Sequence, residues 1–249
     1  MSNIRIFECG YCKGFERFVL KDGSFNLINF PAKVALIHLN EGFMLFDCGY
    51  PSDFELLKKK YLCFKLYSMI LPTVSNEDTS CISQLKKAGI NPEEIKYVFI
   101  SHFHVDHAGG MKDFPNAKFI CSQVEYQQVK ISKSLTAVMA GKLLPDNFED
   151  RTLFVEDFKG DFIIEEGLIP IHLPGHTNNQ YGLFCKNHKT LLASDSAWSD
   201  KAYMENKLPP ALSMLIMEDK KKYIETINLL TEMSKDNKIV ISHSEVKDD

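Results

Sequence analysis

The 249-residue chain lacks both a long hydrophobic run and an N-terminal targeting pattern. No apolar stretch approaches the ~18 residues that a membrane-spanning helix needs. The segment MSNIRIFE at the start has no basic region followed by an apolar run, which argues against a secretory signal peptide. We therefore predict a cytoplasmic protein with no membrane partner.

Basic residues are not in excess and form no long block. The chain has 29 Lys and Arg residues against 33 Asp and Glu residues, and its formal net charge is -4. The basic runs at 58–60 and 220–222 are typical of solvated helix faces. This balance gives no support for a nucleic-acid partner, and we expect a small-molecule substrate instead.

The seven cysteines are scattered and odd in number, in a chain long enough to fold without disulfides. We expect them to be reduced thiols, as in a cytosolic protein. Cys9 and Cys12 form a C-x-x-C motif, which can serve as a redox pair or part of a metal site. No second C-x-x-C and no helix start follow it, so a thiol-based module stays an alternative of a different class.

Side chains that can bind metals are concentrated in the run SHFHVDHAGG at 101–110. The apolar, β-branched and aromatic segment 96–100 before it predicts a buried strand, so the run begins where a strand ends. In an extended chain His102 and His104 project to the same side, while Asp106 and His107 can turn toward a second point. Burying these groups without a partner would be costly, so the run predicts a metal site with up to two ions.

Three later strand ends carry one residue of the same kind each. His176 follows the apolar run 168–173, Asp195 follows 190–193, and His243 follows 238–242. Each alone is weak, because a His or Asp in a turn is common, but together they complete two ligand sets. Asp47, at the end of a run at 43–46, is either a turn residue or a carboxylate that orients a metal-bound histidine.

Hydrophobic patterning predicts two β-rich halves, each followed by helices, without a low-complexity linker between them. We expect a single domain over 1–249, with a helical excursion at about 123–160 that covers the site. The expected strands are 3–8, 34–39, 43–46, 96–100, 117–121, 162–164, 168–173, 181–185, 190–193 and 238–242, and the expected helices are 52–71, 78–88, 123–145 and 218–234.

In its order and spacing, the set of His and Asp residues resembles the metal ligands of the metallo-β-lactamase superfamily. Asp47-Cys48-Gly49 is similar to the Asp-x-Gly turn of that family, and the resemblance spans about 4–245. It implies an α+β fold of the αββα sandwich type, in which two mixed β-sheets pack face to face with helices on the outer faces. It also implies two divalent metal ions.

Carried over by position, the resemblance implies two ligand sets joined by one bridging carboxylate: His102, His104 and His176 for one ion, Asp106, His107 and His243 for the other, and Asp195 between them. Nitrogen and carboxylate ligands without thiolate suit zinc first, and also iron, manganese or cobalt. Two ions roughly 3.5–4 Å apart would share a bridging hydroxide as the nucleophile. Asp106 would also act catalytically by handling the proton, and Asp47 would support a ligand without binding metal.

Within the superfamily, the chain most resembles the N-acyl-homoserine lactonase group. The carrying motifs are Asn76-Glu77-Asp78, the His-rich run, Gln123-x-Glu125-Tyr126 and Pro174-Gly175-His176-Thr177. Those lactonases have a Tyr three residues after the bridging Asp, where it contacts the substrate carbonyl. Here that position is Trp198, whose indole has a donor but no acidic hydroxyl. We expect Trp198 and the nearby Tyr203 to bind the substrate.

The sequence thus predicts a dinuclear metal-dependent hydrolase of an ester-like bond, with a lactone as the first candidate substrate. We expect the enzyme to be a monomer or a homodimer. The apolar segments 11–30, 61–75 and 127–150 are expected to select the substrate. Alternatives on the same fold are a glyoxalase II-like thioesterase and a phosphodiesterase. A di-iron oxidoreductase is a further alternative, but relatives of that class carry Glu where this chain has His104.

Overall fold

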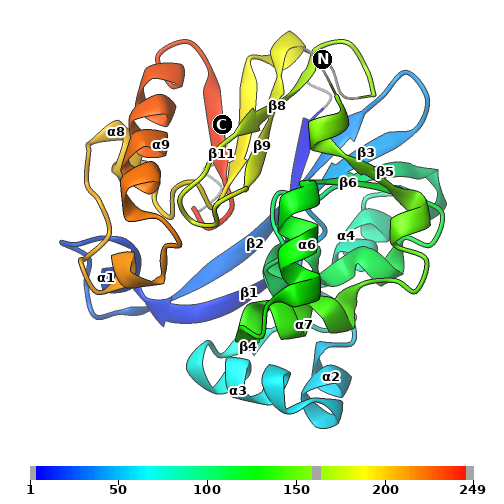
Figure 1. The fold of residues 1–249 in the computed structure, drawn as a ribbon, viewed down its shortest axis with the longest axis horizontal. Helices are drawn as coiled ribbons and strands as arrows, with labels where there is room; N and C mark the ends of the chain where they lie inside the picture. Colours follow the sequence, from blue (N-terminus) through cyan, green and yellow to red (C-terminus); the bar gives the residue numbers. More distant parts are fainter. Residues whose placement is uncertain (1–3, 159–163, 245–249) are drawn as a thin grey trace. The chain divides into compact units, whose positions relative to one another are not determined.

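A computed structural model describes residues 4–158 and 164–244, and these form two compact units (Figure 1). The first unit is made of the residues up to Cys12 together with those from Ala32 to Lys159, and the second of Lys13–Pro31 and the residues from Gly160 onward. Most of the larger β-sheet belongs to the first unit, while the ends of its first two strands, 13–15 and 27–31, and the whole smaller sheet belong to the second. No helix in the described ranges has the length and apolar character needed to cross a bilayer.

The first unit is organised by a mixed sheet with the strand order β4-β1-β2-β3-β5-β6-β7. A hairpin joins β2 to β3, and β3, β5, β6 and β7 then run parallel. The strands are β1 (Ile4–Phe15), β2 (Leu27–His38), β3 (Phe43–Phe46), β4 (Thr73–Val74), β5 (Ile95–Phe99), β6 (Lys118–Cys121) and β7 (Thr152–Phe154). The helices are α2 (Phe54–Lys60), α3 (Leu62–Ile70), α4 (Cys81–Lys87), α5 (Val105–Ala108), α6 (Gln123–Ile131) and α7 (Leu135–Leu143), with short 3-10 turns at Pro92–Glu94, Gly109–Asp113, Glu149–Arg151 and Val155–Asp157.

The second unit is organised by a smaller mixed sheet with the order β11-β10-β9-β8. Its central strand β10 is fully buried and pairs antiparallel to β9 and parallel to β11. The strands are β8 (Leu168–His172), β9 (Tyr181–Cys185), β10 (Thr190–Ser194) and β11 (Lys238–Ile241). The helices are α1 (Glu16–Val19), α8 (Asp200–Met204) and α9 (Lys220–Met233), with 3-10 turns at Lys186–His188 and Ser213–Ile216.

Helix α9 packs one apolar face into the core of the second unit. The side chain of Asp219 accepts the backbone N–H groups of Lys221 and Lys222 at 3.0 Å, which satisfies donors that the first helical turn leaves open. Tyr223 and Ile227, four residues apart, then face the same buried cluster. The helix is therefore fixed at its start and along its length.

The predicted class of two mixed sheets with helices is confirmed, but several element boundaries differ. The helix expected at 52–71 splits because Tyr61 is extended, with φ -129° and ψ 128°, after three lysines whose charge favours a helix C-terminus. The helix expected at 123–145 breaks at Ser132 and Ser134, whose hydroxyls compete with helical hydrogen bonds.

The first strands and the region before β8 also differ from expectation. β1 and β2 each span 12 residues rather than the six that were predicted for each. β7 lies within the helical excursion expected at about 123–160. Of the strand predicted at 162–164, the first two residues lie outside the described ranges, and Ile164 is left-handed with φ 67°. The single domain over 1–249 stays a prediction.

Candidate metal centre

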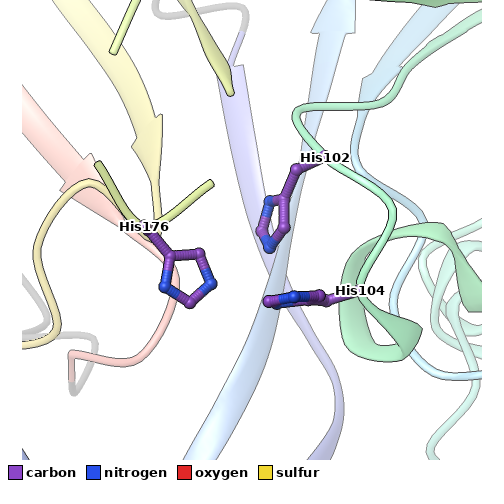
Figure 2. A group of neighbouring side chains, drawn as sticks. All are labelled: His102, His104 and His176. Carbon is purple, nitrogen blue, oxygen red and sulfur yellow. The ribbon is translucent and has the colours of Figure 1, made fainter. Parts of the chain in front are cut away.

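In the first unit, the histidine run occupies the loop after β5 and the short helix α5. His104 is extended at the start of this helix, and Asp106 and His107 lie within it. The ring of His102 lies 4.5 Å from that of His104 and 4.2 Å from that of His107, centroid to centroid. Figure 2 shows His102 and His104 next to each other. The strand end and the helix thus bring three imidazoles and one carboxylate of this unit together.

Asp47 holds this group from the end of β3. Its Oδ2 accepts Nδ1–H of His107 at 2.8 Å, and its two oxygens accept the backbone N–H and the hydroxyl of Ser101 at 2.9 and 3.0 Å. Asp47 is fully buried and adopts φ 60°, a conformation that few residues other than glycine adopt. Because a carboxylate only accepts, Nδ1 of His107 carries the proton, and Nε2 is the atom with which this ring can bind metal.

The close approach of α5 to the end of β3 requires glycine. A Cβ at Gly110 would lie 2.4 Å from the carbonyl oxygen of Cys48, and that residue in turn donates its N–H to the carbonyl of His107 at 2.8 Å. The Gly-Gly pair after the histidine run is therefore a packing requirement. It lets the Asp47 carboxylate reach the imidazole of the helix.

In the second unit, the loop that carries His176 is fixed against α9. Gly175 has φ 135°, and a Cβ there would lie 2.3 Å from Cα of Tyr223. The carbonyls of Gly175 and His176 accept the N–H groups of Asp219 and Glu218 at 3.1 and 3.2 Å. No other residue type fits at 175 without moving the helix, so the position of His176 depends on this contact.

Asp195 follows an irregularity at the end of β10. The pairing of β10 with β11 shifts register between Leu192 and Ser194, and Ser194 is left-handed with φ 50°. Such bulges and strained residues redirect the side chains beside them and are common at functional sites. Asp195, 3% exposed, is directed to two imidazoles of this unit.

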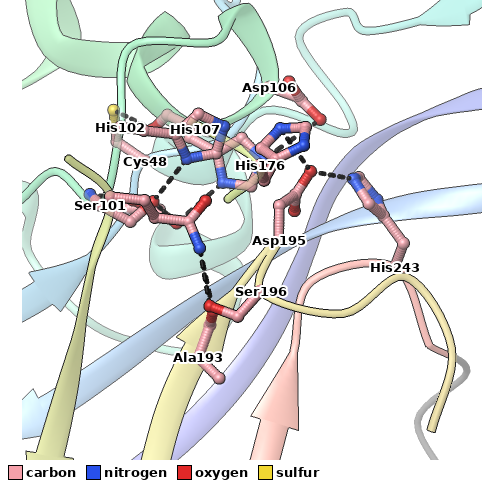
Figure 3. A network of polar contacts seen from close by, with 12 residues as sticks. Cys48, Ser101, His102, Asp106, His107, His176, Ala193, Asp195, Ser196 and His243 are labelled. Atoms are coloured by element: carbon pink, nitrogen blue, oxygen red, sulfur yellow. Dashed lines mark hydrogen bonds and ion pairs between the residues drawn. The ribbon is translucent and has the colours of Figure 1, made fainter. Parts of the chain in front are cut away.

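One oxygen of Asp195 lies close to both histidines. Its Oδ2 is 3.4 Å from Nε2 of His176 and 3.2 Å from Nε2 of His243 (Figure 3). Nδ1 of His243 lies 2.9 Å from the carbonyl of Pro31, which only accepts, so this nitrogen carries the proton. Nε2 of His243 then faces the carboxylate of Asp195. Two groups allow this contact: a proton on Nε2, which makes the ring an imidazolium, or a cation bound by both Nε2 and the carboxylate.

These separations suit ligands of one ion. Two donor atoms about 2.0–2.2 Å from a tetrahedral metal lie about 3.3–3.6 Å from each other. In the first unit, Nε2 of His107 and Oδ2 of Asp106 are 3.4 Å apart, and in the second unit Asp195 shows 3.4 and 3.2 Å to its two histidines. Both donor sets therefore fit a divalent metal in chemistry and in spacing.

The two residues expected to bind substrate are both buried in the core of the second unit. Nε1 of Trp198 donates to Oδ2 of Asp195 at 3.3 Å, and its ring meets that of His176 edge-on at 5.6 Å. The hydroxyl of Tyr203 donates to Oδ1 of Asp200 at 2.8 Å. Burial, followed by the charge of Asp200, raises the pKa of Tyr203, so this phenol stays protonated.

Tyr223 is a residue of this region that the sequence did not single out. Its hydroxyl oxygen is buried and interacts with the backbone of Trp198. Burial raises the pKa of Tyr223, the charge of Asp195 adds to the rise, and the backbone of Trp198 opposes part of it. Its place in an apolar helical stripe is typical of a core residue, so the spacing of Tyr223 alone did not indicate a role near the candidate site.

Six of the seven cysteines are buried thiols, and Cys63 is half-buried. Within the described residues there is no disulfide, and Cys9 lies beside Cys81. Burial is the main cause that raises the pKa of Cys9, and the hydrogen bond to Cys81 adds to it. A thiol protonated in this way is a poor nucleophile and a poor ligand, which disfavours a redox or metal module that uses Cys9.

Known proteins resemble this chain in sequence. A family model described as the Metallo-beta-lactamase superfamily matches residues 28–243. An N-acyl homoserine lactonase of Bacillus sp is 28% identical over 186 residues, which are 74% of this chain and 70% of that protein. The N-acyl homoserine lactonase AttM of Azorhizobium caulinodans is 30% identical over 169 residues, which are 64% of this chain and 62% of that protein.

Solved structures show the same fold over nearly the whole chain. An N-acyl homoserine lactone hydrolase with the product N-hexanoyl-L-homoserine at its metal centre has a TM-score of 0.75 and 20% identity, with 98% of this chain and 93% of that chain covered. The dizinc quorum-quenching lactonase AidC has a TM-score of 0.69 and 17% identity, with 97% and 87% covered.

Proposed function

The chain belongs to the metallo-beta-lactamase superfamily and is a metal-dependent hydrolase, and from this premise we propose that it opens lactones, those of N-acyl-homoserine first. The relatives described above are lactonases, which favours a lactone over a thioester or a phosphodiester. The observation that carries the proposal is the single oxygen of Asp195 within 3.4 Å of two imidazole nitrogens.

We propose that two divalent ions, zinc first, are held by two ligand sets and a shared carboxylate. The sets are His102, His104 and His176 for one ion, Asp106, His107 and His243 for the other, and Asp195 for both. Support comes from the ligand-like distances within each unit and from the fixed Nδ1 protons of His107 and His243. Iron, manganese or cobalt would suit the same donors.

The residues of the chain then have separate roles in ring opening. Bound metal would make water a nucleophile at neutral pH and polarise the lactone carbonyl. The water oxygen bonds to the carbonyl carbon, the ring C–O bond breaks, and Asp106 accepts the proton of the water and returns it to the leaving oxygen. Asp106 sits on α5 beside His107, whose imidazole Asp47 keeps in one orientation.

We propose that the substrate lies against Trp198 and apolar side chains of the covering segments, which are the stretches 11–30, 61–75 and 127–150. Several of these are exposed, among them Phe18 and Phe25 in 11–30, Met69 in 61–75 and Ile131 in 127–150. Other apolar residues of the same segments are buried and belong to the core. To donate to a substrate, Tyr203 would have to release Asp200. An apolar wall suits a lactone with a hydrocarbon tail.

We further propose that the enzyme acts in the cytoplasm as a monomer or homodimer, on a small molecule and without a nucleic-acid or membrane partner. The acidic balance of the chain and its reduced thiols support this. Gel filtration with light scattering would measure the mass. A larger assembly, or protein recovered with membranes after fractionation, would contradict the proposal.

The test is a substrate panel with the zinc-loaded protein. We expect kcat/KM to be highest for an N-acyl-homoserine lactone, when compared with a glutathione thioester and an aryl phosphodiester. His102→Ala and His243→Ala should lose metal and activity together. Faster hydrolysis of the thioester or phosphodiester would overturn the substrate, and full metal content and rate in both variants would overturn the ligand assignment.

A further inference from the structure

Trp198 stands where the resembling lactonases have a tyrosine, and its one polar atom is already engaged. Nε1 of the indole lies 3.3 Å from Oδ2 of Asp195. An indole N–H can only donate and a carboxylate can only accept, so the direction of this bond is fixed whatever the protonation of the neighbouring histidines. The Trp198 N–H is therefore directed at the carboxylate of Asp195.

From this contact we propose that Trp198 is a positioning residue, which orients the Asp195 carboxylate toward His176 and His243. The inference rests on the proposed function for the metal ions that these three residues would hold. The indole and both histidine nitrogens lie nearest Oδ2, which has about two of the four lone-pair sites of the carboxylate, so accepting the indole and binding two ions would use both oxygens of Asp195. The indole restrains the rotation that a carboxylate on a turn would otherwise have.

The turn that carries Asp195 and the indole ring of Trp198 are both held in place, so the indole can restrain the carboxylate. The hydroxyl of Ser196 donates to the carbonyl of Ala193 at 2.6 Å and accepts Nε2–H of Gln180 at 2.7 Å, so the chain on either side of Asp195 is anchored (Figure 3). Trp198 is 9% exposed and packs edge-on against His176. A side chain locked by packing can orient a ligand closely, because it has few other rotamers to visit.

The single tryptophan of the chain makes the bond measurable. In the metal-free protein labelled with ¹⁵N, one indole N–H signal is expected. It should shift in Asp195→Asn, and again when zinc binds to the wild type. Thr231→Val is the matched control, because its hydroxyl donates within the same unit to the carbonyls of Tyr203 and Ile227 and not to Asp195. An indole signal that shifts neither in Asp195→Asn nor on zinc binding would overturn the inference.

Metal affinity tests whether the bond positions a ligand. Trp198 should be replaced by 3-benzothienylalanine, which has the shape of tryptophan but sulfur in place of N–H, and Trp198→Phe serves as a second variant. Both should bind zinc about tenfold more weakly, as expected when a partner of a ligand is lost. Unchanged zinc affinity in both folded variants would overturn the inference alone, whereas a wild type that binds no zinc would overturn the proposed function.

Discussion

The carboxylate of Asp47 lies 2.8 Å from Nδ1 of His107, and both side chains are almost completely buried. The two residues are 60 positions apart in sequence, and β3 and α5 bring them together. A buried carboxylate beside an imidazole fixes which nitrogen holds the proton and how the ring points. We therefore propose that Asp47 supports His107 as a metal ligand without binding metal itself.

Asp47→Asn should weaken zinc affinity or lactone turnover by roughly ten- to a hundredfold, because the amide supports the imidazole less well. Zinc competition with a chromogenic chelator would measure the affinity. Asp113→Asn is the matched control: it makes the same chemical change at a carboxylate of the same unit that accepts a hydrogen bond from Ser52. An Asp47→Asn protein that equals wild type would show that this residue is only a turn residue.

Gly175→Ala should lower the free energy of unfolding by roughly 2–4 kcal/mol, because overpacking adds to an unfavourable backbone conformation. The new Cβ would lie 2.3 Å from Cα of Tyr223 at φ 135°. Gly141→Ala, within α7 with no atom inside 4 Å of its Cβ, should instead raise stability by roughly 0.5–1 kcal/mol. Urea unfolding measures both, and equal effects of the two changes would contradict the packing described for Gly175.

Asp113 should make stability depend on pH. Burial raises the pKa of its carboxyl, and the Ser52 hydroxyl offsets part of the rise. The folded state then keeps this proton to a higher pH than the unfolded state, so the contribution is present below the unfolded pKa and is lost as pH rises through the folded pKa. Asp113→Asn should gain stability over wild type at neutral pH but not in acid. An equal difference at both pH values in urea unfolding would contradict this.

Lactone turnover should increase with acyl-chain length, because each methylene group buried against apolar side chains adds favourable binding free energy. Met69→Ser, an exposed residue of α3, should reduce the preference for long chains. Leu56→Ser on α2 is the matched control, since it is similarly exposed but lies outside the covering segments. Ratios of kcat/KM for short and long acyl chains report the effect, and a flat profile in wild type would contradict it.

The strand ends that precede candidate ligands were the most predictable part of the fold. The apolar runs before His102, Asp195 and His243 all form strands that stop just before these residues. Such strands are predictable because a buried strand is itself a short run of apolar residues. The break at Tyr61 and the left-handed backbone at Ser194 were not predictable, because tertiary packing decides both. The ligand roles of these residues stay predictions.

The polar contacts around the candidate site were less predictable than its position. A Trp three residues after Asp195 could be noted in the sequence, but its N–H could have pointed to substrate, solvent or carboxylate. Only the folded turn directs it to Asp195. Likewise, Tyr223 follows the same spacing as the core residues Ile227 and Leu230, and nothing in that spacing distinguishes its buried hydroxyl.

The most direct test is to titrate the metal-free protein with zinc while following hydrolysis of N-hexanoyl-homoserine lactone. The rate should rise with added zinc and level off at about two equivalents per chain, as expected for a two-metal site in which both ions act. A protein that binds two equivalents of zinc but does not open the lactone, or one that opens it without metal, would contradict the account.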